Sequence, residues 1–297
     1  MARIALIGPG AIGGTVCSSL VSAGHDVQVC AHQAFATLTL SKANGELLGS
    51  VPVEVVTSPK DVRPADWVLV CVKAHQTPTA QAWLSSAVRT GTKVAVLQNG
   101  VEHRDRVSSF LKPDVEIVPV VVQLPAQRTE PGKITIYGGA VLIVADSEAG
   151  KEFAGLFPDT FVRIQVTDDF MTRQWEKLCL NASSGSISTL TLNPDAIATV
   201  PGLKDLAKNI IRECIAVGRA EGAKLEDGYA DTLVEGHMSR TGNRGNSMYY
   251  DRLAGRMLEY DARNAVVTRM GRKHGIPTPV SDTLVPLLRA LCPKSER

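Results

Sequence analysis

The sequence lacks the features of a nucleic-acid-binding, membrane-spanning or secreted protein. Its 32 Lys and Arg residues balance 30 Asp and Glu residues, so the net charge is only +2 and the strong basic excess of a dedicated nucleic-acid binder is missing. No apolar run approaches the roughly 18 residues that a membrane helix needs. The first residues also lack the apolar region and cleavage site of a signal peptide. We therefore predict a cytoplasmic protein with neither nucleic acid nor membrane as a partner.

Metal-binding and redox motifs are also missing. The six cysteines are scattered and form no C-x-x-C pair, and the six histidines form no pair at i,i+4 spacing that could hold a metal ion. We therefore predict that the protein has no metal site. We also expect reduced thiols, as is usual in a cytoplasm.

What the sequence does contain is typical of a globular protein large enough for two domains. It has 297 residues, of which 44% are hydrophobic and 21% are charged. Short apolar runs alternate with a helical pattern over Ala11–Ala23, which predicts a parallel sheet with helical crossovers. The predicted strands are Arg3–Ile7, Asp26–Cys30, Val51–Val56, Trp67–Val72 and Lys93–Leu97.

The pattern changes twice after Gly100. The β-rich segments 115–122, 133–137, 140–144 and 162–166 are predicted to extend the same sheet, partly in antiparallel fashion. From Asp168 onward the apolar residues recur at helical spacing, which predicts helices over 170–191, 201–221, 225–237, 247–274 and 279–291. The predicted fold class is therefore α/β, with an N-terminal domain over residues 1–167 and a C-terminal all-α domain over residues 168–297.

A glycine-rich segment follows the first predicted strand and opens the first predicted helix. It reads Gly8-Pro9-Gly10-Ala11-Ile12-Gly13 and fits the pattern G-x-G-x-x-G. In this context the first glycine makes a tight turn, the second lets the backbone approach a pyrophosphate, and the third lets the helix pack on the strand. The N-terminus of the helix carries a partial positive charge, which favours binding of the phosphates. We therefore predict a Rossmann-type dinucleotide-binding domain; the alternative is a plain strand-to-helix turn.

The end of the second predicted strand bears on which dinucleotide binds. An NAD site would place an acidic residue there, whereas an arginine would accommodate the 2′-phosphate of NADP. The segment Cys30–Ala34 contains neither. His32 or Gln33 could contact either a ribose or a phosphate. Because no carboxylate repels a 2′-phosphate, the sequence favours NADP without excluding NAD.

Polar residues that could line a site occur at the ends of two strands and on one helix. Lys73 and Asn99 follow the fourth and fifth predicted strands, at the sheet edge where ligands bind in open parallel sheets. Lys177 and Asn181 are four residues apart and share a helix face, which Ser184 and Ser188 continue. The alternatives are a simple turn at Asn99, a surface charge at Lys73 and a solvated helix face.

The fourth predicted helix of the C-terminal domain carries a second group of polar residues. Ser247 is predicted as its N-cap because serine is favoured there. Glu259 and Asp261 are expected within the same helix. From residue type alone, both are read as surface carboxylates.

Together these segments resemble the ketopantoate reductase (2-dehydropantoate 2-reductase) family along nearly the whole chain. The resemblance rests on the order of the motifs: the glycine segment, Val72-Lys73-Ala74, Gln98-Asn99-Gly100, Trp175-x-Lys177-Leu178-x-x-Asn181, Ser247-Met248-x-x-Asp251 and Gly255-Arg256-x-x-Glu259-x-Asp261. It implies NADPH-dependent reduction of 2-dehydropantoate to (R)-pantoate, a step toward pantothenate and coenzyme A.

The resemblance also implies roles for individual residues. Lys177 matches the catalytic lysine and is the hypothetical general acid, and Glu259 matches the active-site glutamate. Asn99, Asn181 and Ser247 match substrate-binding positions. The cofactor is implied to contact the glycine segment, Asn99, His32 and Lys73. A homodimer is a further expectation, although no sequence feature fixes it.

Three positions depart from the family pattern. The family usually has arginine where this chain has His32, and many members have a second asparagine where this chain has Gly185. Val101 also replaces the more usual glycine after Gly100. Two alternatives therefore stay open. One is an NADH-dependent 2-hydroxyacid dehydrogenase of the same architecture, and the other is a non-catalytic dinucleotide sensor.

Overall fold

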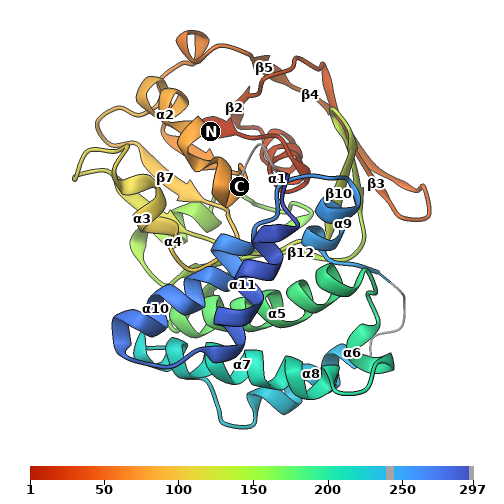
Figure 1. The fold of residues 1–297 in the computed structure, drawn as a ribbon. Helices are drawn as coiled ribbons and strands as arrows, with labels where there is room; N and C mark the ends of the chain where they lie inside the picture. Colours follow the sequence, from red (N-terminus) through yellow and green to blue (C-terminus); the bar gives the residue numbers. More distant parts are fainter. Residues whose placement is uncertain (239–243, 294–297) are drawn as a thin grey trace. The chain divides into compact units, whose positions relative to one another are not determined.

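The structure is a computed structural model of the chain, and it describes residues 1–238 and 244–293. The chain forms two compact units (Figure 1). The first unit comprises Met1–Gln98 and His103–Phe170. The second comprises the short segment Asn99–Glu102 and the chain from Met171 onward. The first unit is α/β and the second is helical, so the predicted fold class is confirmed.

The first unit is built on a six-stranded sheet in which every pair of neighbours is parallel. The strand order is β5-β2-β1-β6-β7-β8. The strands are β1 (Arg3–Ile7), β2 (Asp26–Cys30), β5 (Glu54–Val56), β6 (Trp67–Val70), β7 (Lys93–Val96) and β8 (Glu116–Pro119). The predicted strands at both ends of α1 (Ala11–Ser22) are thereby confirmed.

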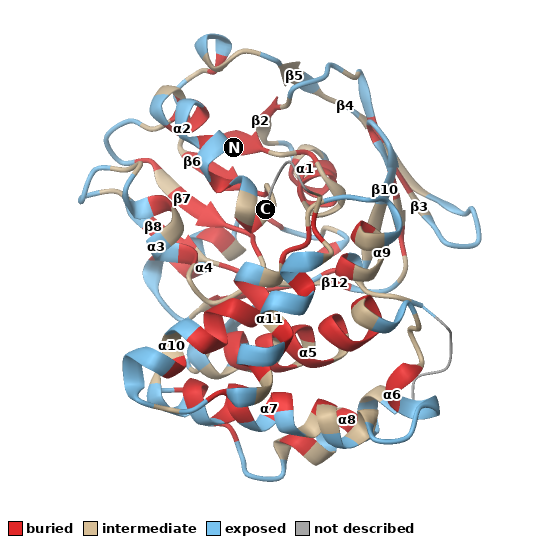
Figure 2. Cartoon of the chain, in the orientation of Figure 1, coloured by how far each residue is buried: buried red, intermediate tan, exposed pale blue. Residues whose placement is uncertain are grey.

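Alternate residues of the central strands fill two separate cores. Ile4 and Leu6 of β1 pack into one cluster, whereas Ala5 and Ile7 pack into another. Successive strand side chains point to opposite faces, so a strand covered on both faces must be apolar throughout. Figure 2 shows β6 and β7 as buried. The continuous apolar runs in the sequence are explained by this two-sided burial.

The other strands form two small sheets of their own. The predicted segments 133–137, 140–144 and 162–166 therefore do not extend the parallel sheet, whereas the first part of segment 115–122 does, as β8. One sheet has the order β10-β11-β3-β4 and the other β13-β12-β9. The expected antiparallel pairing occurs between β9 and β12 and between β10 and β11. The strands are β3 (Thr37–Lys42), β4 (Leu47–Pro52), β9 (Val121–Gln123), β10 (Ala126–Glu130), β11 (Lys133–Ile136), β12 (Ala140–Ala145) and β13 (Val162–Thr167).

The sequence analysis did not predict β3, which anchors the four-stranded sheet. β11 pairs with it in parallel, and Leu38 and Ile134 of these two strands join the core that contains α1. A Cβ at Gly14 of α1 would lie 3.1 Å from Leu38 Cδ2. The glycine therefore lets the second sheet pack closely against this helix. The shorter helices of the unit are α2 (Gln81–Ala87), α3 (His103–Ser108), α4 (Glu148–Ala154), and the 3-10 segments Pro59–Asp61 and Ala74–Ala80.

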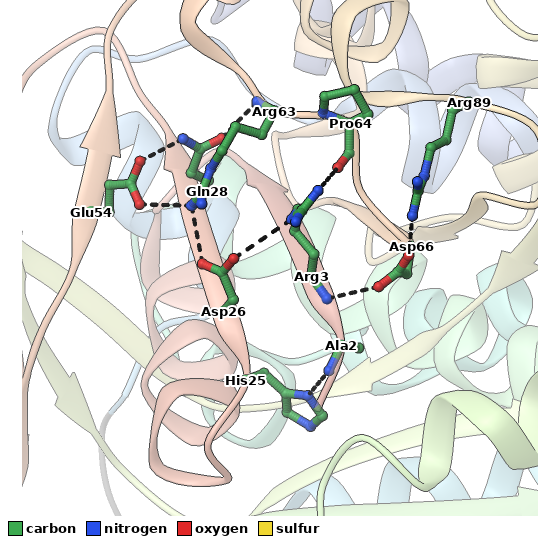
Figure 3. A network of polar contacts seen from close by, with 10 residues as sticks. All are labelled: Ala2, Arg3, His25, Asp26, Gln28, Glu54, Arg63, Pro64, Asp66 and Arg89. Atoms are coloured by element: carbon green, nitrogen blue, oxygen red, sulfur yellow. Dashed lines mark hydrogen bonds and ion pairs between the residues drawn. The ribbon is translucent and has the colours of Figure 1, made fainter.

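An ion-pair network lines the amino ends of the parallel strands (Figure 3). Arg3 N donates to Asp66 Oδ2 at 2.9 Å, a hydrogen bond that lowers the pKa of Asp66. Arg63 Nη2 contacts Asp26 Oδ1 at 3.0 Å and Glu54 Oε2 at 2.8 Å. These charges pair at the amino edge of the sheet, whereas the glycine segment follows β1 at the carboxyl edge.

The second unit packs its helices around the buried indole of Trp175. A Cβ at Gly218 would lie 2.8 Å from that ring, so only glycine fits there without displacement. The helices are α5 (Phe170–Thr191), α6 (Ala196–Thr199), α7 (Leu203–Ala220), α8 (Tyr229–Met238), α9 (Ser247–Leu253), the π-helix η3 (Asp261–Ala265), α10 (Val266–His274) and α11 (Pro279–Ala290). The bounds of α5 match the prediction, while α6 was not predicted.

The predicted single helix over 247–274 is wrong, because the chain breaks between α9 and η3. Gly255 has φ +63°, a conformation that residues other than glycine rarely adopt. Arg256 closes the turn on Asp251, with its N donating to Asp251 O at 2.8 Å and its Nε to Asp251 Oδ1 at 3.0 Å. Glu259 consequently lies just before η3 and not inside a helix.

The amino end of α11 is held by a buried carboxylate, and its removal should destabilise the protein. Glu213 of α7 accepts hydrogen bonds from Val280 N at 2.7 Å, Ser281 N at 2.8 Å and Ser281 Oγ at 2.6 Å. We expect Glu213→Ala to lower the free energy of unfolding by about 2–4 kcal/mol, because three donors lose a charged acceptor. Urea unfolding measures this change. The control Glu235→Ala, at an exposed position of α8, should stay within about 0.5 kcal/mol of wild type; equal effects would contradict the prediction.

Candidate functional site

The glycine segment has the geometry of a dinucleotide-binding turn. Gly8 has φ +93°, and a Cβ there would lie 2.7 Å from Val72 Cγ1. A Cβ at Gly13 would collide with the Gly8 carbonyl oxygen and lie 2.9 Å from Cys71 Cβ. At Gly10, by contrast, nothing described lies within 4 Å of a Cβ position. The first and third glycines therefore stand where no side chain would fit, and the second leaves the backbone open to a ligand.

The amino end of α1 fits the phosphates of such a cofactor. Gly10 is its N-cap and supplies no side-chain hydrogen bond, and the first turn contains no acidic residue. The first backbone N–H groups of a helix have no partner within the helix, and they favour an anion. Pro9, Ala11 and Ile12 complete the segment. This part of the chain can therefore hold a pyrophosphate.

His32 and Lys73 lie at the same edge of the parallel sheet as the glycine segment. His32 is exposed, two residues after the end of β2, and Lys73 is half-buried directly before the 3-10 segment Ala74–Ala80. Because β1, β2 and β6 are parallel neighbours, the residues that follow them share one edge. Their positions match the predicted cofactor contacts, but the roles stay predictions.

Asn99 is carried by a tight loop that leaves the parallel sheet. Gln98 is buried, and its Nε2 donates to Val72 O at 3.0 Å and to Thr77 Oγ1 at 2.9 Å. The loop closes where His103 Nε2 contacts Gln98 O at 2.8 Å. Between these anchors, Asn99–Glu102 packs with the helical unit. The loop thus presents Asn99 to Asn181 of α5 and to Glu259, which precedes η3.

A chain of hydrogen bonds joins four residues that the sequence analysis singled out. Asn181 Nδ2 donates to Asn99 Oδ1 at 3.1 Å, and Asn99 Nδ2 donates to Glu259 Oε2 at 3.0 Å. Arg263 Nη2 donates to the same Glu259 oxygen at 3.2 Å and to Ser247 Oγ at 2.7 Å. The structure therefore brings Asn99, Asn181, Glu259 and Ser247 together, through Arg263.

The burial of these groups distinguishes the site from an ordinary surface. Glu259 is 4% exposed and Asn181 8%, so the surface-carboxylate and solvated-face readings are wrong for them. Asp261 is exposed and pairs with Arg269 at 2.6 Å, as a surface carboxylate does. The structure thus separates two neighbouring acids that the sequence could not. A buried carboxylate needs charged or hydrogen-bonding partners, and Glu259 has both.

Lys177 lies one helical turn before Asn181. It is half-buried and four residues earlier in α5, so the two side chains lie on the same face of the helix. The face therefore carries an ammonium group next to the amide that begins the hydrogen-bond chain. Its predicted role as general acid stays a prediction.

Ser247 is placed by its neighbour, and the prediction that it caps α9 is wrong. Asn246 is the N-cap, because its Oδ1 accepts from Met248 N at 3.0 Å and Tyr249 N at 3.2 Å. Asn246 Nδ2 also donates to Ser188 Oγ at 2.6 Å, which ties the start of α9 to α5. Ser247 is consequently free of the capping role and accepts from Arg263.

Sequence reasoning missed Arg263. The available signal was its spacing, since Glu259 and Arg263 are four residues apart, the distance at which opposite charges pair on a helix. It was overlooked because charged residues in a helix are mostly exposed, whereas Arg263 is 2% exposed. It is the only charged residue among the largest fully buried side chains of the described chain.

Residues 1–238 and 244–293 contain no group of three or more His, Cys, Asp or Glu side chains placed to hold a metal ion. In the same residues, no helix is both long and apolar enough to cross a membrane. All six cysteines are buried, and burial raises the pKa of Cys17 and of Cys30 to about 12, so these two thiols are poor nucleophiles.

Comparison with known proteins connects this arrangement with one family. The family described as ketopantoate reductase PanE/ApbA matches residues 4–148, and its C-terminal counterpart matches residues 169–292. The curated 2-dehydropantoate 2-reductase of Caulobacter vibrioides is 41% identical to this chain, over 98% of this chain and 99% of its own length.

Solved structures share the fold over the same extent. The 2-dehydropantoate 2-reductase of Geobacter metallireducens is 28% identical with a TM-score of 0.89, covering 97% of this chain and 99% of its own. A dimeric ketopantoate reductase of Staphylococcus aureus is 25% identical with a TM-score of 0.87, covering 99% of this chain and 100% of its own. Both units are therefore represented in these relatives.

The histidine that closes the Asn99 loop should make stability depend on pH. Burial lowers the pKa of His103 to about 4, whereas in the unfolded chain it is about 6.5. As the pH falls, His103 therefore binds a proton in the unfolded chain before it does so in the folded chain. We expect the His103 contribution to stability to be complete above pH 6.5 and to fall by up to about 3 kcal/mol as the pH drops to 4.

The measurement is urea unfolding of wild type and His103→Gln between pH 7.5 and 4. Glutamine does not titrate in this range. The pH dependence of the difference in unfolding free energy between the two proteins therefore reports the protonation of His103 alone. We expect that difference to shift in favour of the variant as the pH falls. A difference that stays constant over this range would contradict a buried, neutral His103.

Proposed function

The chain belongs to the ketopantoate reductase family, and we propose that it reduces 2-dehydropantoate to (R)-pantoate with NADPH, in pantothenate biosynthesis. The enzyme is an oxidoreductase acting on a CH–OH group, and its substrate is a small 2-oxo acid. The observation that carries the proposal is the buried hydrogen-bond chain from Asn181 through Asn99 and Glu259 to Arg263 and Ser247. It assembles in one place the polar groups that a hydroxylated 2-oxo acid needs.

The first unit supplies the cofactor site. When bound, a reduced nicotinamide supplies the hydride that reaches the carbonyl carbon. Gly10 leaves the backbone open to the pyrophosphate, and α1 directs its first N–H groups to the phosphates. At the end of β2, the exposed His32 takes the place of a ribose-binding acid. No carboxylate there repels a 2′-phosphate, which favours NADPH over NADH.

Lys177 is the proposed general acid. As the carbon–hydride bond forms, negative charge builds on the carbonyl oxygen, and an ammonium group stabilises it and donates a proton. The oxygen gains the proton from Lys177 Nζ, and solvent then reprotonates the amine. Asn181, on the same helix face, directs its amide toward Asn99 and so helps to hold that side of the site in place.

Glu259 and Ser247 are the proposed contacts for the polar ends of the substrate. Glu259 is a buried hydrogen-bond acceptor, suited to the substrate hydroxyl. Ser247 accepts a hydrogen bond from Arg263, so its own hydroxyl hydrogen can go to the substrate carboxylate. Asn99 presents an amide whose orientation is fixed on both sides, by Asn181 and by Glu259.

The alternative enzyme function is NADH-dependent reduction of another 2-oxo acid. His32 and Gly185 motivate it, because both depart from the family pattern at cofactor and substrate positions. The remaining expectations follow from the relatives. We infer a homodimer from the dimeric protein of Staphylococcus aureus, and a cytoplasmic location from the enzyme class.

The decisive experiment follows spectrophotometrically the oxidation of NADPH and of NADH by the purified protein with 2-dehydropantoate, 3-methyl-2-oxobutanoate and pyruvate. We expect the highest kcat/KM for the pair of NADPH and 2-dehydropantoate. A preference for NADH or for another 2-oxo acid would favour the alternative enzyme. Tight NADPH binding without turnover of any 2-oxo acid would favour the dinucleotide sensor.

Removal of the proposed general acid should slow the reaction without weakening cofactor binding. We expect Lys177→Ala to lower kcat by about 10²–10⁴-fold, the usual contribution of a positioned acid. Steady-state kinetics and NADPH fluorescence titration measure the two effects. Lys112→Ala, at an exposed lysine of the first unit, serves as the control. Near-normal turnover by Lys177→Ala would exclude it as the proton donor.

A further inference from the structure

Arg263 is a buried cation whose hydrogen-bonding capacity is only partly used. Its side chain is 2% exposed, and Nη2 makes both of its contacts, with Ser247 Oγ and Glu259 Oε2. Nε is buried without a partner in the described chain, and the hydrogen bonds found there include none from Nη1. Buried guanidinium groups normally use their donors. The donors of Arg263 that bind no other residue therefore indicate a ligand near Ser247.

Gly185 of α5 is a neighbour of this guanidinium. A Cβ at position 185 would lie 3.9 Å from Arg263 Nη1 and 3.8 Å from Met248 Cε, at ordinary contact distance. A longer side chain directed the same way would enter the space next to Nη1. In particular, an asparagine amide would lie two bonds beyond that Cβ. A side chain of that length and direction would therefore press on the guanidinium, whereas alanine would not.

We propose that Arg263 is a substrate-binding residue that, together with Ser247, binds the carboxylate of the 2-oxo acid. The inference rests on the proposed function and names the residue that sets its preference for an acid. Arg263 Nη1 thereby supplies the donor that many family members have as an asparagine at the position of Gly185.

Charge and geometry both favour a carboxylate as the ligand. Glu259 engages Nη2 and leaves the opposite nitrogen for a second anion. Arginine presents several donors in a fixed plane, which suits the two oxygens of a carboxylate. Ser247 is exposed, and its hydroxyl accepts from Nη2, so its hydrogen remains available for donation to a ligand. One carboxylate can therefore accept from both residues at the edge of the buried group.

The test compares a charged ligand with an uncharged one of the same shape. Pantoate and its primary amide are titrated calorimetrically into the protein loaded with NADP⁺. Wild type should bind the acid about 10–100-fold more tightly than the amide, because a charged hydrogen bond is involved. Arg263→Met should bring that ratio near one, and Arg263→Lys should restore part of it. The KM for NADPH should be unchanged.

A second pair of variants tests the same site without removing the arginine. Gly185→Asn should displace the guanidinium and lower the preference for the acid, whereas Gly185→Ala should keep it, since one carbon fits at contact distance. The double variant combines Gly185→Asn with Arg263→Met. In it, the asparagine should weaken binding of the acid less than it does in Gly185→Asn alone, because the guanidinium that it would displace is no longer there. Arg212→Met, at an exposed arginine of α7, is the control for charge.

Three outcomes would overturn the inference. Arg263→Met could weaken the acid and the amide equally, which indicates a purely structural role. The preference for the acid could survive in Arg263→Met, or Gly185→Asn could leave it unchanged. If wild type reduces a 2-oxo acid other than 2-dehydropantoate, the proposed substrate is wrong, and that acid and its amide then decide the role of Arg263. If it binds no 2-oxo acid, both proposals fail.

Discussion

The buried carboxylate of Glu259 is the constraint on which the candidate site depends. A charge that is 4% exposed is costly unless its partners compensate for it. Those partners are Asn99, from the loop after β7, and Arg263, from η3. Removing either would leave the carboxylate undercompensated, which costs more than the pair contributes when intact. The burial of one acid therefore couples two segments that are far apart in the sequence, the loop after β7 and the segment that leads into η3.

Much of the fold could be predicted because burial on both sides leaves a clear trace in the sequence. Arg3–Ile7 is a short, mostly apolar run next to a turn, Asp26–Cys30 is a strand-like segment of the same length, and the long helix α5 has a helical pattern that only Gly185 interrupts. The errors have a different origin. β3 is polar on alternate residues, and its pairing with β11 is a tertiary choice that no local pattern contains. The break at Gly255 needs a positive φ, and a glycine inside a helical pattern does not reveal that by itself.

The sequence indicated which residues belong to the candidate site better than it indicated how they are arranged. Motif order brought Asn99, Asn181, Ser247 and Glu259 forward, and the structure joins them by hydrogen bonds. Which of two nearby acids is buried could not be read from residue type, since Glu259 and Asp261 are both carboxylates. Arg263 was missed for the related reason that a single arginine in a helical segment is read as a surface charge. Burial is a property of the packed chain, so these distinctions required the structure.

The two departures from the family pattern differ physically, and the difference shows how far motif matching can be trusted. His32 is exposed at a strand end, so exchanging it for arginine changes a surface side chain and disturbs no packing. Gly185 lies beside a buried guanidinium, so its exchange for asparagine is tied to what stands at position 263. A missing motif residue of the second kind does not imply a missing function, because a neighbour in space can take over the donor. The effect of a substitution at a packed position therefore depends on the residue that contacts it, as position 185 depends on position 263.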